Sequence, residues 1–216
     1  MEWFGLTWAI LIFAAYLIGS TPTAYLAVRL LKGQDIRRLG DGNAGAGNVF
    51  RIIGSRVGIV VATVDIGKGA AAVLLVRGFL DSTAAEMIAG VAAVAGHSWP
   101  VHLRLRGGRG AAVAVGVLMV MFPALVIPLS IVALGVLYFI KSAIKALGFF
   151  FISLPFISLV LVFLAPMGNR GYSYPLIAYS VGIPVMVGLS HYLSLRRVPP
   201  PAHPDWNRGE QAMPRG

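Results

Sequence analysis

Residues 38–48 read Arg-Leu-Gly-Asp-Gly-Asn-Ala-Gly-Ala-Gly-Asn, a polar stretch in a chain that is mostly apolar. Its glycines, Gly40, Gly42, Gly45 and Gly47, can take positive φ and let a ligand approach the backbone closely. Successive N–H groups in such a loop form a nest for anions, and the N-terminus of a following helix adds a positive dipole end. The stretch therefore favours a phosphate-binding loop over the alternative, a flexible linker between helices.

Arg37, Arg38 and Arg51 flank this first glycine loop, as residues 38–48 are called below. A guanidinium group binds phosphate through two parallel hydrogen bonds, so arginines at these positions strengthen the phosphate interpretation. The glycine spacing matches neither the Walker pattern nor the dinucleotide-binding fingerprint. Nucleotide binding is therefore not expected.

The composition is that of an integral membrane protein. Hydrophobic residues make up 57% of the 216 residues, charged residues make up 12%, and the mean hydropathy is +0.80. The absence of cysteine excludes disulfides, thiolate nucleophiles and cysteine-bound metals. The net charge of +10 suits anionic lipid headgroups or phosphorylated substrates. Nucleic acid is not an expected partner, because the basic residues lie in short loops between apolar runs.

Long apolar runs predict the membrane-spanning helices, and they cover residues 3–31, 58–80, 84–99, 111–139, 146–165 and 174–195. Pro22 predicts a kink in the first run, and Pro123 divides the fourth run into two short spans. We therefore expect an all-α integral membrane protein with a seven-span helical bundle in residues 1–197. A disordered cytoplasmic tail should follow in residues 198–216. One bent helix over residues 111–139 would reduce the number of spans to six.

The distribution of basic residues predicts the orientation. The segments 32–56, 104–109, 141–145 and the chain from Arg196 onward contain 5, 3, 2 and 4 Lys or Arg residues, whereas the opposite-side loops contain only Arg77 and Arg170. Under the positive-inside rule these four segments are cytoplasmic and the N-terminus is outside.

Residues 107–110, Gly-Gly-Arg-Gly, form a second, shorter glycine loop on the same side of the membrane. Two flexible glycines and the Arg109 cation at a helix start resemble the first glycine loop, although a basic topogenic turn is the simpler alternative. Asp65 and Lys68 lie three residues apart on one helical face within a span. They form either a structural ion pair or a support behind the first glycine loop.

Two of the histidines are candidate site residues. His97 follows a glycine at the end of a span, where a hydrogen-bonding role is more common than a catalytic one. His191 precedes a basic pair near the cytoplasmic end of the last span and is the better candidate. No two histidines have the helical spacing of metal ligands, so no metal is expected.

Five motifs in order resemble the PlsY family. They are Gly19-Ser20-x-Pro22; Arg38-x-Gly40-x-Gly-Asn43-x-Gly45-Ala46-x-Asn48-Val49-x-Arg51; Asp65-x-x-Lys68-Gly69; Gly96-His97-x-x-Pro100-Val101; and Gly107-Gly-x-Gly110. Members are bacterial inner-membrane acyltransferases that move a fatty acyl group from acyl phosphate to the 1-hydroxyl of glycerol 3-phosphate, which makes lysophosphatidic acid. The resemblance implies seven spans, a site on the cytoplasmic side, no cofactor, and contact with membrane lipids. We expect a monomer.

The resemblance also implies the site residues. The catalytic candidates are Asp41, Arg51, Arg109 and His191. The candidates for substrate binding are Arg38, Gly40, Gly42, Asn43, Gly45, Gly47, Asn48, Lys68, His97, Gly107, Gly108, Ser142 and Ser194.

The chain departs from the family pattern near the chemistry. The family's first loop reads Gly-Ser-Gly-Asn-Pro-Gly-Ala-Thr-Asn, whereas this chain has Asp41, Ala44 and Gly47 in place of its serine, proline and threonine. Arg109 replaces a lysine, and Ser194 replaces an asparagine.

Asp41 has three possible explanations. The carboxylate pairs with an arginine, acts as a general base toward the acceptor hydroxyl, or repels phosphate in a relative with altered or no catalysis. The last explanation is favoured slightly, because Gly47 and Ser194 have also lost groups that the family keeps. Accordingly, the alternative function is an inactive paralogue that binds phosphorylated lipid precursors or regulates an active relative.

Overall fold

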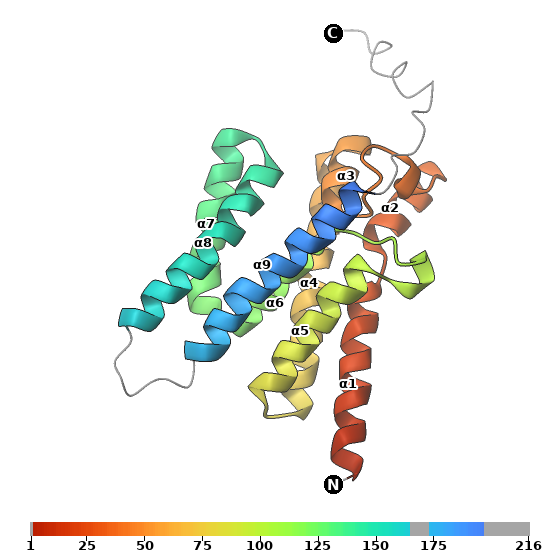
Figure 1. Cartoon of the computed structure of the whole chain (residues 1–216). Helices are drawn as coiled ribbons and strands as arrows, with labels where there is room; N and C mark the ends of the chain where they lie inside the picture. Colours follow the sequence, from red (N-terminus) through yellow and green to blue (C-terminus); the bar gives the residue numbers. More distant parts are fainter. Residues whose placement is uncertain (1, 165–172, 197–216) are drawn as a thin grey trace, which may run out of the picture.

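The computed structural model describes residues 2–164 and 173–196, in which every regular element is helical (Figure 1). The α-helices are α1 (Glu2–Ser20), α2 (Thr23–Lys32), α3 (Ala46–Ile52), α4 (Ser55–Phe79), α5 (Thr83–Ser98), α6 (Ala111–Met121), α7 (Pro123–Ile140), α8 (Ala143–Leu164) and α9 (Ser173–Leu195). Two short 3₁₀ helices are η1 (Ile36–Arg38) and η2 (Val101–Leu103). The tail expected in residues 198–216 lies outside the described residues.

The first apolar run is divided into two helices at the predicted position. Helix α1 ends at Ser20 and α2 begins at Thr23, because Pro22 between them cannot donate a hydrogen bond to a continuing helix. The sequence predicted a kink, and the structure has a complete break. Helix α2 turns aside at one end of the bundle, above α1 in Figure 1.

The predicted break at Pro123 is confirmed. Helix α6 ends at Met121, and Pro123 occupies the first position of α7, where a helix needs no N–H donor. In Figure 1, α6 runs away from the end that carries α3, and α7 runs back toward it. The 111–139 run therefore reverses direction and is not one bent helix.

By length and hydropathy, five segments of the described chain can cross a membrane. They are Gly5–Lys32, Ser55–Phe79, Pro123–Ile140, Ala143–Leu164 and Ile177–Leu195. Helices α5 and α6, with 16 and 11 residues, are shorter than the roughly 20 residues that a typical bilayer requires. The all-helical membrane class is confirmed. Five segments of the described chain meet the length criterion; the expected count of seven spans also includes the shorter helices α5 and α6 and stays a prediction.

Glycines allow the central helices to approach one another closely. A Cβ atom on Gly116 of α6 would collide with the Ile66 carbonyl of α4, and one on Gly96 of α5 would collide with the Tyr16 carbonyl of α1. Without water to drive association, helices in lipid gain most of their stability from such close packing. The α7–α8 pair stands apart from this centre in Figure 1, and α9 crosses between the two groups.

We predict that Gly116→Ala destabilises the protein by about 1–3 kcal/mol, the usual cost of overpacking a filled interior. Gly135→Ala is the matched control, because a Cβ on Gly135 of α7 has no neighbouring atom within 4 Å. Thermal unfolding in detergent measures both variants. A Gly116→Ala melting temperature equal to that of the control would show that the α4–α6 contact is looser than described.

Candidate active site

The Asn48 side chain organises the first glycine loop from inside. This side chain is fully buried, and its Nδ2 donates to the backbone oxygens of Leu39 at 2.9 Å and Asn43 at 3.1 Å. Its Oδ1 accepts a hydrogen bond from the backbone N–H of Asp41 at 3.3 Å. Buried polar groups need such partners. The Asn48 side-chain amide, which was expected to bind substrate, therefore makes its hydrogen bonds to the backbone of the loop.

The four glycines of the loop have different structural roles. Gly40 and Gly42 have φ of +57° and +69°, the left-handed conformation that glycine adopts easily. Gly45 is extended, with φ of −139°, and caps the start of α3. Gly47 lies inside α3, and a Cβ there would have no neighbour within 4 Å. The expected positive φ is therefore correct for Gly40 and Gly42 and wrong for Gly45 and Gly47.

Asp41 joins the two glycine loops through its carboxylate. Its Oδ1 accepts from the Asn43 backbone N–H at 3.2 Å, and its Oδ2 lies 2.5 Å from Arg51 Nη2 and 3.2 Å from Arg109 Nη2. Charge-assisted hydrogen bonds of this kind are stronger than neutral ones. Of the three explanations for Asp41, the geometry favours an arginine-paired carboxylate. The explanation in which the carboxylate repels phosphate stays a prediction, because the pairing with arginines does not test it.

The second glycine loop lies on the C-terminal end of α5. The backbone N–H groups of Gly107 and Gly108 donate to the Ser98 and His97 carbonyls at 3.2 and 3.1 Å, which satisfies two of the free carbonyls at that helix end. A Cβ on either glycine would collide with His97. These glycines are therefore needed for close approach, whereas the sequence suggested flexibility.

Helix α9 brings His191 and its neighbours toward the second loop. The Ser190 hydroxyl donates to the Gly108 carbonyl at 3.4 Å, and the charges of Arg109 and Asp41 both act on the half-buried His191. Ser194 lies half-buried in the last turn of α9, three residues after His191. The structure thus gathers Asp41, Arg51, Arg109 and His191, the four catalytic candidates, at one end of the bundle.

Lys68 and His97 lie behind the loops in a buried polar cluster. Lys68 Nζ is 2.9 Å from Asp65 Oδ1 and donates to the Thr21 carbonyl at 2.8 Å. His97 Nδ1 is 3.9 Å from the same Asp65 oxygen, and its Nε2 faces Gly108. Lys68 and His97, both expected to contact substrate, are therefore buried against protein groups. This arrangement matches the alternative that the Asp65–Lys68 pair supports the first glycine loop from behind.

Ser142 is far from this region. It lies in the turn between α7 and α8, which Figure 1 shows well separated from α3 and the first loop. Its hydroxyl accepts a hydrogen bond from the backbone N–H of Lys145 at 3.4 Å, as a helix cap does. The structure therefore does not bring Ser142 together with the two glycine loops, with which it was expected to bind substrate.

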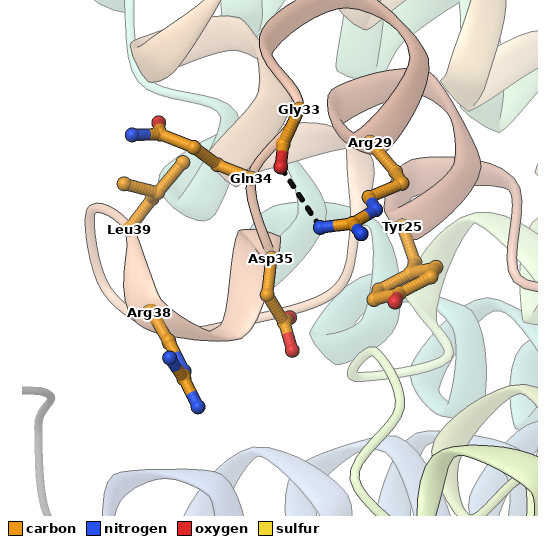
Figure 2. Close-up of a pocket in the computed structure, with 7 residues that line it drawn as sticks. All are labelled: Tyr25, Arg29, Gly33, Gln34, Asp35, Arg38 and Leu39. Atoms are coloured by element: carbon orange, nitrogen blue, oxygen red, sulfur yellow. Dashed lines mark hydrogen bonds between the residues drawn. The ribbon is translucent and has the colours of Figure 1, made fainter.

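Sequence reasoning overlooked a second link between the loops. The Arg37 guanidinium donates to the Asp35 carboxylate at 2.7 Å and to the Leu103 carbonyl at 2.9 Å. The hydrogen bond from Arg37 lowers the pKa of the Asp35 carboxyl below its usual value. The Asp35 carboxylate also caps η1. An Asp two residues before a basic residue at a helix start is the local signal that could have indicated this cap. Arg38, in contrast, is exposed and lines cavities beside the loop (Figure 2).

The described residues contain no group of three His, Asp or Glu side chains that could hold a metal ion. An all-helical membrane protein with two arginines, a histidine and glycine-loop N–H groups at one end is suited to a phosphate-bearing ligand. Fold and site therefore define a multi-pass membrane protein that handles phosphorylated compounds.

Residues 9–198 match the family model of glycerol-3-phosphate acyltransferase. This chain belongs to that family, as its resemblance to PlsY implied. It is 38% identical to glycerol-3-phosphate acyltransferase 4 of Dehalococcoides mccartyi, over 85% of this chain and 94% of the relative. It is 36% identical to the glycerol-3-phosphate acyltransferase of Prochlorococcus marinus, over 82% of this chain and 87% of the relative.

Two crystal structures of PlsY, an integral membrane glycerol 3-phosphate acyltransferase, have a similar fold. The glycerol 3-phosphate form has a TM-score of 0.73 and 29% identity, covering 89% of this chain and 92% of that chain. The lysophosphatidic acid form has a TM-score of 0.71 and 27% identity, covering 89% and 91%.

Gly40→Ala should open the first glycine loop, because a side chain at positive φ costs about 1–2 kcal/mol and its Cβ would collide with Asn48 Oδ1. We expect trypsin to cut after Arg38 about tenfold faster in this variant, since cleavage follows the population of the open loop. Gly47→Ala is the control and should be cut at the wild-type rate. Equal cleavage of both variants would contradict the assigned roles of the two glycines.

Proposed function

We propose that this chain transfers a fatty acyl group from acyl phosphate to the 1-hydroxyl of glycerol 3-phosphate, giving lysophosphatidic acid in phospholipid synthesis. The observation that carries the proposal is the joining of the two glycine loops by Arg51, Asp41 and Arg109 in a chain that matches the acyltransferase family over residues 9–198. Two guanidinium groups at one point suit a doubly charged phosphate.

Acyl transfer from acyl phosphate requires little activation of the leaving group. The acceptor hydroxyl oxygen bonds to the acyl carbon, the bond from that carbon to the phosphate oxygen breaks, and the hydroxyl proton passes to a base. Arg51 and Arg109 would hold phosphate oxygens, the first-loop N–H groups would stabilise the developing negative charge, and His191 would donate a hydrogen bond. The protein thus supplies orientation and electrostatic stabilisation.

Other contacts to phosphate are assigned to the backbone of the first loop and to α9. Gly40 and Gly45 would present N–H groups to phosphate, and Ser194 would supply a hydroxyl. The Gly42 N–H donates to the Leu39 carbonyl and the Asn43 N–H to the Asp41 carboxylate, so the Asn43 N–H would meet phosphate only where phosphate replaces that carboxylate. Five further residues act as positioning residues in this proposal: Asn48, Lys68, His97, Gly107 and Gly108. Their polar atoms bond to other protein groups, or, for the two glycines, the absence of a side chain lets the second loop pack against His97.

The proposed setting is the bacterial inner membrane, with the chain as a monomer. Helices α1, α4, α5, α6, α7, α8 and α9 would each cross it, with the N-terminus outside and the site at the cytoplasmic face. The alternating helix directions in Figure 1 support this topology, because both glycine loops and the α7–α8 turn lie at the end opposite the N-terminus.

The purified protein in detergent should convert palmitoyl phosphate and glycerol 3-phosphate to lysophosphatidic acid and inorganic phosphate. Arg51→Ala should weaken transition-state and acceptor binding by about 1.5–3 kcal/mol, the worth of a charge-assisted hydrogen bond. Arg51→Lys should restore only part of this, because lysine lacks the planar fork. Kinetic assays that vary glycerol 3-phosphate measure the effect.

Arg56→Ala removes the same charge five residues further along the chain, from an exposed position outside the two loops, and should leave kcat and KM unchanged. Normal kinetics in Arg51→Ala would remove this arginine from the site. Equal losses in both variants would point to net charge and not to a specific contact.

Asp41→Ser should lower KM for glycerol 3-phosphate, because the carboxylate competes with the substrate phosphate for Arg51 and Arg109. Asp41→Asn should do the same while keeping the side-chain shape. If Asp41 is instead a general base, Asp41→Asn should lower kcat by about 10²–10⁴-fold with KM little changed. Melting temperatures of both variants separate these effects from simple loss of structure.

The pairing of Asp41 with both arginines is also the observation that favours the second candidate function, a relative that binds phosphorylated lipid precursors without turnover. Binding of glycerol 3-phosphate by wild type without acyl transfer, in Asp41→Ser as well, would establish that alternative. Transfer by wild type excludes it.

Single cysteines at the two ends of α4 test the topology, because the chain contains no natural cysteine. Ser55 and Asp81 are both exposed. Asp81→Cys should react with an impermeant thiol reagent in intact cells, and Ser55→Cys should react only after the membrane is opened. The reverse pattern would overturn the proposed orientation.

A further inference from the structure

A basic cavity lies beside the first glycine loop, between η1 and the segment that follows η2. Its volume is about 330 Å³, and it is lined by Asp35, Arg37, Arg38, Arg104 and Arg106. None of Asp41, Arg51, Arg109 and His191 contributes to its wall. The cavity shares Arg38 with the residues expected to bind substrate, but the proposed function assigns no role to Arg37, Arg104 or Arg106.

The charge of the cavity is strongly positive. Arg37 is held by the Asp35 carboxylate, by the Leu103 carbonyl and by the Tyr25 ring, whose centroid lies 5.5 Å from its guanidinium carbon. For Arg38, Arg104 and Arg106, no carboxylate of residues 2–164 and 173–196 lies within ion-pair distance. Three guanidinium groups around one small cavity form a receptor for an anion with several oxygens.

The backbone that positions two of these arginines is strained. Arg104 and Leu105 have φ of +55° and +59°, a conformation that is unfavourable for residues other than glycine. Hydrogen bonds from their N–H groups to Val101 and Pro100, at 2.9 and 3.0 Å, hold the turn. Strain of this kind tends to be retained where a particular side-chain direction is useful. A basic segment that served only to orient the protein in the membrane would not require it.

The surroundings of the cavity are apolar. Helix α2 ends at Lys32, just before η1, and exposes Leu30 and Leu31 at 83% and 60%. Leu105, between the two cavity arginines, is 52% exposed. A second cavity of about 400 Å³ shares Asp35 and Arg38 and continues along α2 past Arg29 and Tyr25, as Figure 2 shows. Leu30 and Leu31 line neither cavity, but they follow Arg29, which lines the second one, on α2. An amphipathic ligand with its charged group in the cationic cavity would therefore have exposed leucines nearby.

We propose that this cavity binds the phosphate headgroup of an anionic phospholipid of the surrounding membrane, with the acyl chains against Leu30 and Leu31 of α2. The cavity lies at the end of the bundle that carries both glycine loops, where the membrane surface meets the protein. Each arginine near a membrane surface strengthens attraction to anionic lipids. The leucines distinguish a lipid from a free phosphate, which needs no apolar contact.

The test uses the full-length protein in dodecyl maltoside, titrated with dioleoyl phosphatidylglycerol, with bound lipid counted by native mass spectrometry. Arg104→Gln/Arg106→Gln should weaken phosphatidylglycerol binding about tenfold or more, because two charges near the headgroup are lost. Arg56→Gln/Lys145→Gln is the control; it removes two exposed cations outside the cavity and should bind as wild type does. Unchanged melting temperatures confirm that both variants are folded.

Competitors identify the ligand class. Millimolar glycerol 3-phosphate or inorganic phosphate should not displace phosphatidylglycerol, and dioleoyl phosphatidylcholine should bind weakly. Displacement by either free phosphate compound would overturn the lipid assignment. Equal weakening in the control variant would reduce the effect to net charge and would also overturn it. Because the readout is binding, failure of acyl transfer does not affect the result.

Discussion

A buried ion pair at the break between α1 and α2 fixes the elements that carry the site. The side chains of Lys68 and Asp65 are 6% and 2% exposed, and their charged atoms are 2.9 Å apart. The Lys68 ammonium also donates to the Thr21 carbonyl, which in the break between α1 and α2 accepts the Thr23 N–H as well. Removing one partner of such a pair leaves a buried charge without compensation, which is strongly destabilising. The pair therefore links α4 to the break that Pro22 creates, and α2 leads from this break toward the first glycine loop.

The same carboxylate connects this break to the second glycine loop. His97 lies between Asp65 and Gly108, and the N–H groups of Gly107 and Gly108 complete the C-terminal end of α5. The second loop thus packs against the C-terminal end of α5, which the buried Asp65, Lys68 and His97 side chains hold in position. Arg109, the next residue, then reaches Asp41 in the first loop. Function depends on a continuous series of contacts from the membrane interior to the surface.

Much of the fold could be predicted from the sequence, because its signals are local. Pro22 and Pro123 interrupt helices by their covalent structure, whatever surrounds them, and both breaks occur where expected. Loop charge correctly suggested that the two glycine loops belong together. Length and hydropathy alone do not identify α5 and α6 as spans, because both helices are short, and the direction of α6 depends on packing against α4.

The roles of individual site residues could not be predicted, because they depend on distant partners. Gly40 and Gly47 look alike in sequence, yet only Gly40 has positive φ, and the difference arises from where α3 begins. Asn48 resembles a substrate ligand until its amide is seen bonded to loop carbonyls. The bond from Arg37 to Leu103 joins residues 66 positions apart, and no local pattern indicates it.

The two arginines on Asp41 differ in a way that bears on how phosphate enters. The Arg109 side chain is 17% exposed and is held between the second loop and the first, whereas the Arg51 side chain is 52% exposed. A half-exposed side chain on a short helix can change rotamer at little cost, and a buried one cannot. A phosphate that displaces the Asp41 carboxylate would therefore bind an Arg109 side chain that is already in position, and the Arg51 side chain would move to contact it. The exchange replaces one negative charge by two beside the same cations, so attraction to the arginines increases as the carboxylate is released. In the structure, the carboxylate holds the two arginine side chains at one point, where a phosphate would need both of them.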